Sequence, residues 1–116
     1  MKALFINAEE RTVEEIDFDG DYKKIQEKIG CRCFTCVELN AKQDTLYIDD
    51  EGLINGTENF FYVEGKGYCQ PFAGNGLVLG TDNEGDSTDI SGTEKLNITF
   101  MDRLEAAVRA RLGQFA

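Results

Sequence analysis

Residues 4–18, LFINAEERTVEEIDF, predict two short strands around a turn. Leu4 and Ile6 alternate with their neighbours in the first strand, and Val13 and Ile16 lie in the second with less regular spacing. Alternation of apolar and polar residues is typical of a strand with one buried face. The first segment of the chain is therefore predicted to form a β-hairpin.

A short helix is predicted near residues 21–29, within DGDYKKIQEKIG. Asp19 or Asp21 can accept hydrogen bonds from the first turn, and Gly30 can end the helix in a left-handed conformation. Its apolar stripe consists of Tyr22, Ile25 and Ile29.

Two more hairpins are predicted in the middle of the chain. TLYIDDEGLI at 45–54 places a turn at 50–52, and GLVLGTDNEGDSTDI at 76–90 places a second turn near 83–85. The pattern of ENFFYVEG at 58–65 fits either a strand or a short helix.

The last segment, TFMDRLEAAVRARLG at 99–113, predicts a C-terminal helix near 100–112. Thr99 and Asp102 have the spacing of a capping box, although LNITF just before it also fits a strand. The predicted apolar stripe is Met101, Leu104, Val108 and Leu112, and the arginines expected on the solvated face are Arg103, Arg109 and Arg111.

The length of 116 residues is that of one ordinary domain, which can bury a core without a metal or disulfides. The chain has no internal repeat and no linker. We therefore expect a single α+β domain over residues 1–116, with a mostly antiparallel sheet and two helices.

The net charge of −10 is unevenly distributed. Residues 1–37 carry eight acids and six bases, residues 38–94 carry twelve acids and two bases, and residues 95–116 carry two acids and four bases. Such a surface repels nucleic acid and attracts basic partners. The alternative is that the charge only keeps a small protein in solution.

Histidine is absent, which removes Ser–His and Cys–His nucleophile pairs and histidine general bases. We therefore expect a protein that is not an enzyme, although a cluster of carboxylates in a cleft is an alternative. No apolar run approaches the ~20 residues of a membrane span, and the opening segment is too short for a signal peptide. The expectation is a cytoplasmic protein that does not contact membranes.

Four cysteines, Cys31, Cys33, Cys36 and Cys69, are the candidate metal ligands. The C-x₂-C spacing of Cys33 and Cys36 suits two thiolates on one Zn²⁺, and the other two would complete a closed structural Cys₄ site. The objection is that a regular strand points Cys33 and Cys36 to opposite faces. Cysteines that pack as small apolar side chains and a redox pair are the alternatives.

Acidic residues gather at the predicted turns of the two middle hairpins. If the turns lie side by side, their carboxylates imitate the phosphates of DNA and fit a basic groove. Solvated turns and a calcium loop are the alternatives. The candidate partner-binding residues are Asp49, Asp50, Glu51, Asp82, Glu84, Asp86 and Asp89.

A glycine-rich segment, GKGYCQPFAGNG at 65–76, offers backbone amides that can hold a phosphate. With Lys66 and Tyr68 it supports an alternative function, a sponge that sequesters a nucleotide immune messenger. The segment lacks the G-K-[ST] of a phosphate-binding loop, so a plain surface loop remains the other interpretation.

Three stretches, MKALFINAEERTVEEI, DTLYIDDEGL and GNGLVLGTDNEG, together resemble a family of small proteins of unknown function encoded by phages, prophages and conjugative elements. The resemblance covers residues 1–90. It implies a compact domain of mobile-element origin in a bacterial host cell, and it supplies no catalytic residues.

By size, charge and implied origin the chain is also similar to anti-CRISPR inhibitors. The prediction is a non-enzymatic inhibitor of a bacterial defence protein. Its expected target is a CRISPR effector nuclease, whose duplexes lie in positively charged channels, and no direct contact with nucleic acid is expected.

Overall fold

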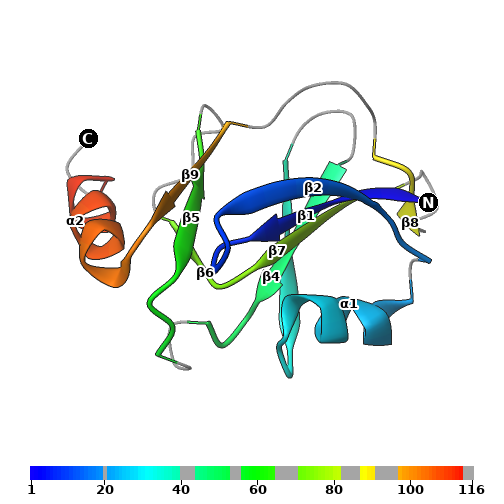
Figure 1. Ribbon diagram of the computed structural model, residues 1–116, viewed down its shortest axis with the longest axis horizontal. Coiled ribbons are helices and arrows are strands. Elements are labelled where there is room, and N and C mark those ends of the chain that lie inside the picture. The colour runs from blue at the N-terminus through cyan, green and yellow to red at the C-terminus, as the bar shows by residue number, and fades with distance from the viewer. Residues whose placement is uncertain are drawn as a thin grey trace.

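The computed structural model describes residues 1–19, 21–39, 44–52, 56–64, 71–81, 87–90 and 97–113 (Figure 1). These residues form a single-domain α+β fold with mostly antiparallel strands, as the sequence predicts. The strands are β1 (Lys2–Asn7), β2 (Thr12–Asp17), β3 (Phe34–Glu38), β4 (Asp44–Asp49), β5 (Phe60–Val63), β6 (Phe72–Ala73), β7 (Gly76–Thr81), β8 (Ser87–Thr88) and β9 (Ile98–Met101). The helices are α1 (Tyr22–Ile29) and α2 (Arg103–Gly113).

The strands form two sheets. The larger has the order β2-β1-β7-β4-β3, with β8 paired to β7, and the smaller has the order β6-β5-β9. Pairing of β1 with β2 and of β7 with β8 confirms two of the predicted hairpins. The segment whose pattern was ambiguous is a strand, β5, at the centre of the smaller sheet.

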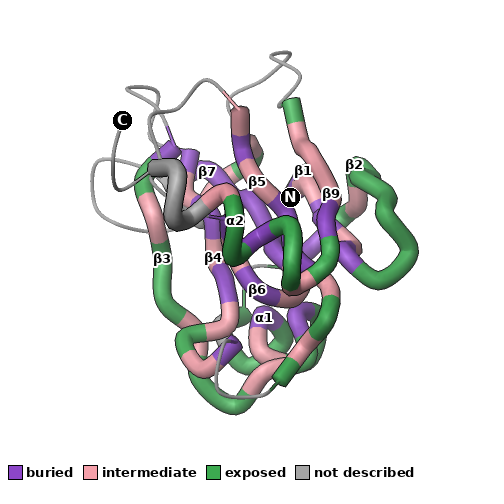
Figure 2. Tube along the Cα trace, turned by 90° about the vertical axis from the view of Figure 1, so that its left-hand side faces the viewer, coloured by how far each residue is buried: buried purple, intermediate pink, exposed green. Residues whose placement is uncertain are grey.

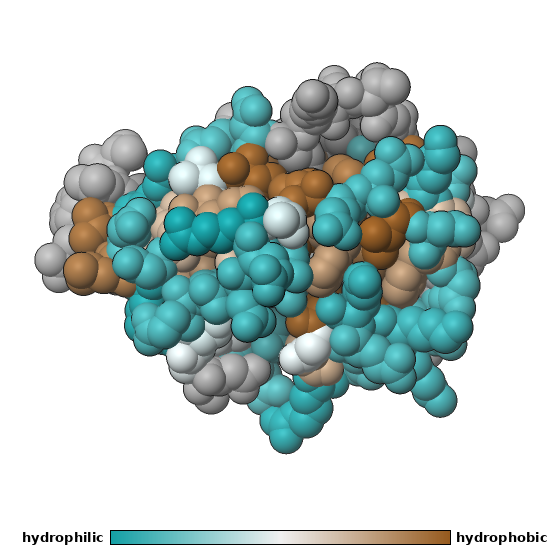
Figure 3. All heavy atoms as spheres, viewed as in Figure 1, coloured by the Kyte–Doolittle hydropathy of each residue, from teal (hydrophilic) through white to brown (hydrophobic). Residues whose placement is uncertain are grey.

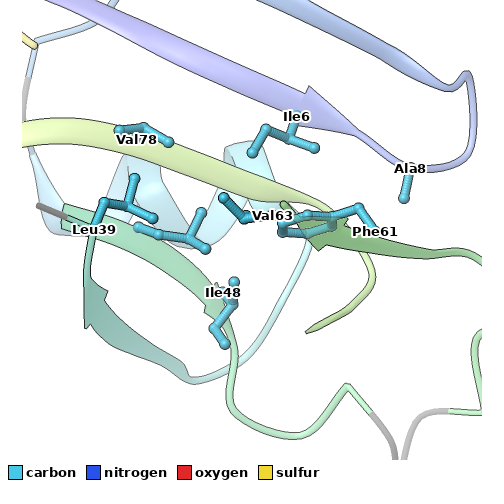
Figure 4. Close-up of a cluster of buried hydrophobic side chains, with 8 residues drawn as sticks. Ile6, Ala8, Leu39, Ile48, Phe61, Val63 and Val78 are labelled. Atoms are coloured by element: carbon cyan, nitrogen blue, oxygen red, sulfur yellow. The ribbon is translucent and has the colours of Figure 1, made fainter. Parts of the chain in front are cut away.

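The elements stack in four layers: α1, the larger sheet, the smaller sheet and α2. Successive side chains of a strand point to opposite faces of the sheet. In β1, β4, β5 and β7 both faces carry apolar side chains, so these strands can be covered on both sides. Full burial of an aliphatic or aromatic side chain stabilises the fold by about 1.5–3 kcal/mol. The cluster between the two sheets, most of which is labelled in Figure 4, consists of Ile6, Ala8, Leu39, Leu46, Ile48, Phe61, Val63 and Val78.

Helix α1 covers the other face of the larger sheet. Ile25 and Ile29 are buried against Phe5, Leu77 and Leu79. The predicted ends of the helix are confirmed, because the carboxylate of Asp21 accepts a hydrogen bond from the amide of Lys23 and Gly30 adopts a φ of 80°. Neither helix in the described ranges is long and apolar enough to cross a membrane.

The hairpin predicted at 45–54 is wrong. β4 pairs with β3 along one edge and with β7 along the other, so it has no edge left for residues 53–54, which lie outside the described residues. The chain instead leaves the larger sheet after the turn and enters the smaller one at β5. The apolar pattern of TLYI is that of a central strand, which local turn signals do not distinguish from one arm of a hairpin.

The N-terminal cap predicted for α2 is also wrong. Thr99 lies in β9, and the helix begins later, with Asp102 as its cap. The Asp102 carboxylate accepts a hydrogen bond from the amide of Glu105 at 2.9 Å, and its carbonyl accepts one from Ala106 at 3.0 Å.

The apolar stripe predicted for α2 is not one buried helical face. Met101 is buried but belongs to β9, and Ala106 of α2 is buried against the smaller sheet. The side chain of Leu112 lies outside the described part of the chain. Leu104 and Val108 face outward, 74% and 53% exposed, and Figure 3 shows hydrophobic atoms at the outer edge of the molecule over α2. Arg103, expected in solvent, is only partly exposed and binds the body of the protein.

Candidate functional site

One end of the larger sheet gathers three turns from distant parts of the sequence. Ile6 of β1 and Ile48 of β4 both lie opposite Gly76, at the start of β7. The turn that follows β1, the turn that follows β4 and the turn that precedes β7 therefore meet at the same end. The three turns belong to the three stretches that carry the family resemblance.

A pocket of about 190 Å³ lies between these turns. Its walls come from the β1–β2 turn, the end of α1, the turn after β4, the approach to β5 and the turn before β7. The residues that line it are Glu9, Ile29, Gly30, Asp49, Gly52, Thr57, Asn59, Gly74 and Asn75.

Hydrogen bonds between the turns fix the shape of the pocket. The amide of Ala8 donates to the Asn75 side-chain oxygen at 2.8 Å, and the amide of Gly74 donates to the Asn59 carbonyl at 2.9 Å. Gly74 has a φ of 83°, a backbone conformation that residues other than glycine rarely adopt. The β1–β2 and β6–β7 turns and the strand entering β5 are thus held as one rim.

The acidic turn after β4 is held by its own first residue. The Asp49 carboxylate accepts a hydrogen bond from the Glu51 amide at 2.9 Å, and the Asp50 amide donates to the Cys33 carbonyl at 3.0 Å. Gly52 closes the turn against Ala73, since a Cβ at Gly52 would lie 2.9 Å from the Ala73 carbonyl oxygen. The turn after β4 therefore packs directly against β6 of the smaller sheet.

Negative charge dominates the rim of the pocket. Glu51 forms a two-point ion pair with Arg32, with N–O distances of 3.1 and 2.7 Å. This pair raises the pKa of the Arg32 guanidinium above its ordinary value. Glu9 and Asp49 line the pocket. Glu10 follows Glu9 in the first turn, which also holds Arg11, and Asp50 and Glu51 follow Asp49 in the second. We call the carboxylates of these two turns, Glu9, Glu10, Asp49, Asp50 and Glu51, the acidic end.

Three of these five carboxylates, Asp49, Asp50 and Glu51, were predicted from the sequence, whereas Glu9 and Glu10 were not. The near balance of charge in residues 1–37 concealed them, because Lys23, Lys24 and Lys28 of α1 offset them in the count. The available signal was their position in the turn of the first hairpin.

The other predicted acidic residues do not join the acidic end. Gly76 and Gly80 lie about 13 Å apart along β7 at a rise of ~3.3 Å per residue, and Gly80 lies opposite Asp44. Asp89 lies at that far end, where its carboxylate accepts a hydrogen bond from the Lys2 amide at 2.8 Å. The structure thus shows no side-by-side pair of acidic turns in the part of the chain that it describes; Asp82, Glu84 and Asp86 lie outside that part.

The described cysteines differ in environment. Cys31 is partly buried against the apolar side chains between α1 and the larger sheet, which we call the α1 cluster, whereas Cys33 and Cys36 are exposed. Cys36 lies within β3, so the strand begins before it. Burial, reinforced by the nearby Asp49, raises the pKa of Cys31 to about 11. Among the described residues, no group of three or more cysteine, aspartate or glutamate side chains could hold a metal ion. Cys69 lies outside them, so the Cys₄ zinc site stays a prediction.

Comparison with known proteins gives one match. No curated protein and no solved structure matches the chain. The domain of unknown function DUF3846 matches residues 1–105, and this span includes the two sheets, α1 and every carboxylate of the acidic end. The resemblance to a family of unknown function is thereby confirmed, and the chain belongs to the DUF3846 family.

Proposed function

We propose that the protein is a non-enzymatic inhibitor that binds a positively charged site on a bacterial defence protein through its acidic end. The observation that carries this proposal is that two acidic turns meet at one pocket, with Glu9 and Asp49 in its walls and three more carboxylates in the same two turns. A basic side chain from the partner can enter the pocket while the outer carboxylates face the surrounding lysines and arginines. Complementary charge of this kind speeds association and favours the correct partner.

A CRISPR effector nuclease is the target that we propose, because such enzymes hold nucleic acid in basic channels. Occupation of the channel by the acidic end would exclude DNA without any chemical step. The nucleotide sponge is less well supported, since Glu9 and Asp49 line the pocket and repel phosphate. Lys66 and Tyr68, which the sponge hypothesis requires, lie outside the described residues.

Two double variants of equal net charge test the proposal. Glu10→Lys/Asp50→Lys reverses two exposed charges of the acidic end, and Glu14→Lys/Glu15→Lys reverses two exposed charges on β2. Each variant is expressed in a bacterium with an active CRISPR system, which is then challenged with a targeted phage.

The wild type and the β2 variant should restore phage titre, and the acidic-end variant should not. In binding to the purified effector, the acidic-end variant should lose at least about tenfold in affinity, about 1.4 kcal/mol. Equal loss in the two variants would show that only net charge matters. Failure of the wild type to protect phage against any CRISPR type tested would refute the choice of target.

A further inference from the structure

The larger sheet ends in two edge strands, β2 on one side and β3 on the other. Figure 2 shows β3 along one side of the molecule, and Thr35 and Cys36 of this strand are exposed. No strand in the described part of the chain pairs with the outer edge of β3. An edge strand presents a row of backbone N–H and C=O groups that another extended chain can bind.

The pairing with β4 identifies the outward backbone groups of β3. The Asp50 amide donates to the Cys33 carbonyl at 3.0 Å, and the Leu39 amide donates to a carbonyl of β4 at 2.9 Å. Opposite residues of an antiparallel pair alternate between hydrogen-bonded and non-hydrogen-bonded, so every second residue from Cys33 to Leu39 turns its backbone towards β4. The N–H and C=O groups of Phe34 and Cys36 therefore point away from the sheet.

The two edges differ in charge. Three of the six residues of β2 are acidic, namely Glu14, Glu15 and Asp17, whereas β3 has no charged residue before its last position. Charged side chains on an edge strand are a common protection against pairing with another chain. The residues from Phe34 to Val37 lack this protection, and phenylalanine, threonine and valine favour strands. The edge of β3 is therefore the one suited to accept a further strand.

The acidic end adjoins the start of this edge. Asp50 is hydrogen-bonded to Cys33, the residue directly before β3, and its side chain is exposed. Arg32 and Glu51 neutralise each other in their two-point ion pair, which leaves Asp50 as the negative charge at this end. A strand added to β3 lies two strand spacings, about 10 Å, from β4. This is about one Debye length at ~0.1 M salt, so a basic residue at that end of the added strand is attracted.

We propose that the edge of β3 accepts an extended segment of the basic partner, which joins the larger sheet as a further strand. The segment is uncharged where it pairs with Phe34 and Cys36, and it places a lysine or arginine at the end next to Asp50. Backbone hydrogen bonds supply the affinity in this mode of recognition, and the flanking charge sets the position of the segment. The inference rests on the proposed function, because the acidic end brings the partner to this edge.

Two blocked peptides of identical charge and side chains test the pairing. One has the sequence Lys-Thr-Val-Thr-Val, and the other is the same peptide methylated on the backbone nitrogen of each threonine and valine. Titrated into the full chain to millimolar concentration and followed by NMR, the first should bind about tenfold more tightly, because it alone can donate to the outward carbonyls. The amides of Phe34 and Cys36 should become protected from exchange only when this peptide is bound.

Proline variants test the same edge from the side of the protein. Cys36→Pro removes an outward N–H and leaves the bonds to β4 in place, and proline is tolerated at such positions of an edge strand. Val13→Pro is the matched control, because Met1 and Phe18 exchange backbone hydrogen bonds and this phase turns Val13 outward on β2. Cys36→Ser keeps the N–H and removes the thiol. Cys36→Pro should lose most of the preference for the unmethylated peptide, and the other two variants should keep it.

Several results would overturn the inference. Equal affinity of the wild type for the two peptides would show that charge alone holds such a segment, and it would leave the proposed function standing. Binding of neither peptide, or loss of the preference in Val13→Pro or Cys36→Ser, would also overturn it. If Cys36→Pro does not fold, the protection of the Phe34 and Cys36 amides in the wild type decides. The phage assay tests the proposed function separately, and its outcome does not alter the comparison of the peptides.

Discussion

At the scale of single residues, the described cysteines predict an order of thiol reactivity. Cys31 packs against the α1 cluster beside Asp49, and its pKa is raised to about 11, so it is a neutral thiol at pH 8. Cys33 and Cys36 are exposed. Because the thiolate is the reactive form and Cys31 is both neutral and partly buried, Cys31 should be alkylated last, after the accessible Cys33 and Cys36. Timed alkylation at pH 8, followed by peptide mass spectrometry, measures this order.

The same experiment separates free thiols from zinc binding. If the cysteines bind no metal, a chelator leaves the order of alkylation unchanged. If Cys31, Cys33 and Cys36 bind zinc with Cys69, all three should resist alkylation until the chelator removes about one metal ion per chain. Slow alkylation of Cys33 and Cys36 without any bound metal would contradict both interpretations.

Single residues also show where local patterns were sufficient. The caps of α1 followed from the sequence because Asp21 and Gly30 act on backbone groups within a few residues of themselves. The turn at Asp49 to Gly52 was located for the same reason. The contribution of Glu9 depends on the register between β1, β7 and β4, which is set by contacts distant in the sequence.

At the scale of elements, one carboxylate contributes to the attachment of α2. Glu64 follows β5 and accepts hydrogen bonds from the Thr99 hydroxyl and from Arg109, each at 2.9 Å. These contacts, with Thr99 first, hold the pKa of Glu64 below its ordinary value of 4.5. A lowered pKa in the folded state means that the stabilisation is complete above the unfolded-state pKa and is lost as pH falls through the folded-state pKa.

We therefore expect α2 to detach from the smaller sheet on acidification below about pH 4.5. Amide exchange measured by NMR should show α2 losing protection before β1 and β7. Glu64→Gln keeps an acceptor but removes the charge, so in this variant α2 should already exchange faster at neutral pH, with less change on acidification. Loss of protection in α2 and the central strands at the same pH would contradict this expectation.

The elements also show how far periodicity reaches. The strands β1 and β7 were recognised because short apolar runs, with Leu4 and Ile6 or Leu77 and Leu79 on one face, are bounded by turn residues, and the apolar spacing of Leu104 and Val108 correctly predicted a helix. The face on which α2 packs was not predictable, since the spacing assigns leucine and valine to the core. Burial of the small Ala106, with two arginines beside it over aromatic rings, reverses that assignment.

At the scale of the whole molecule, charge and exposure divide the surface. Figure 2 shows an exposed segment at one edge, made by the turn before β2 and most of that strand, and most of the charged residues at 9–15 are acidic. Helix α2 lies on the outer side of the smaller sheet, in the layer farthest from α1.

The proposed contact of the acidic end should respond to salt. Binding of the acidic end to a basic partner joins unlike charges and weakens as salt increases. The acidic-end variant Glu10→Lys/Asp50→Lys has a net charge of −10 + 4 = −6, and so has the β2 variant Glu14→Lys/Glu15→Lys.

Because the two variants have the same net charge, any difference between them in partner binding depends on where the carboxylates lie. At low salt the acidic-end variant should bind the basic partner more weakly than the β2 variant. At ~0.1 M salt, where the Debye length is ~10 Å, the wild type should bind more weakly than at low salt. Affinity measured at low and high salt checks both expectations. A wild-type affinity that added salt leaves unchanged would contradict a contact made by the acidic end.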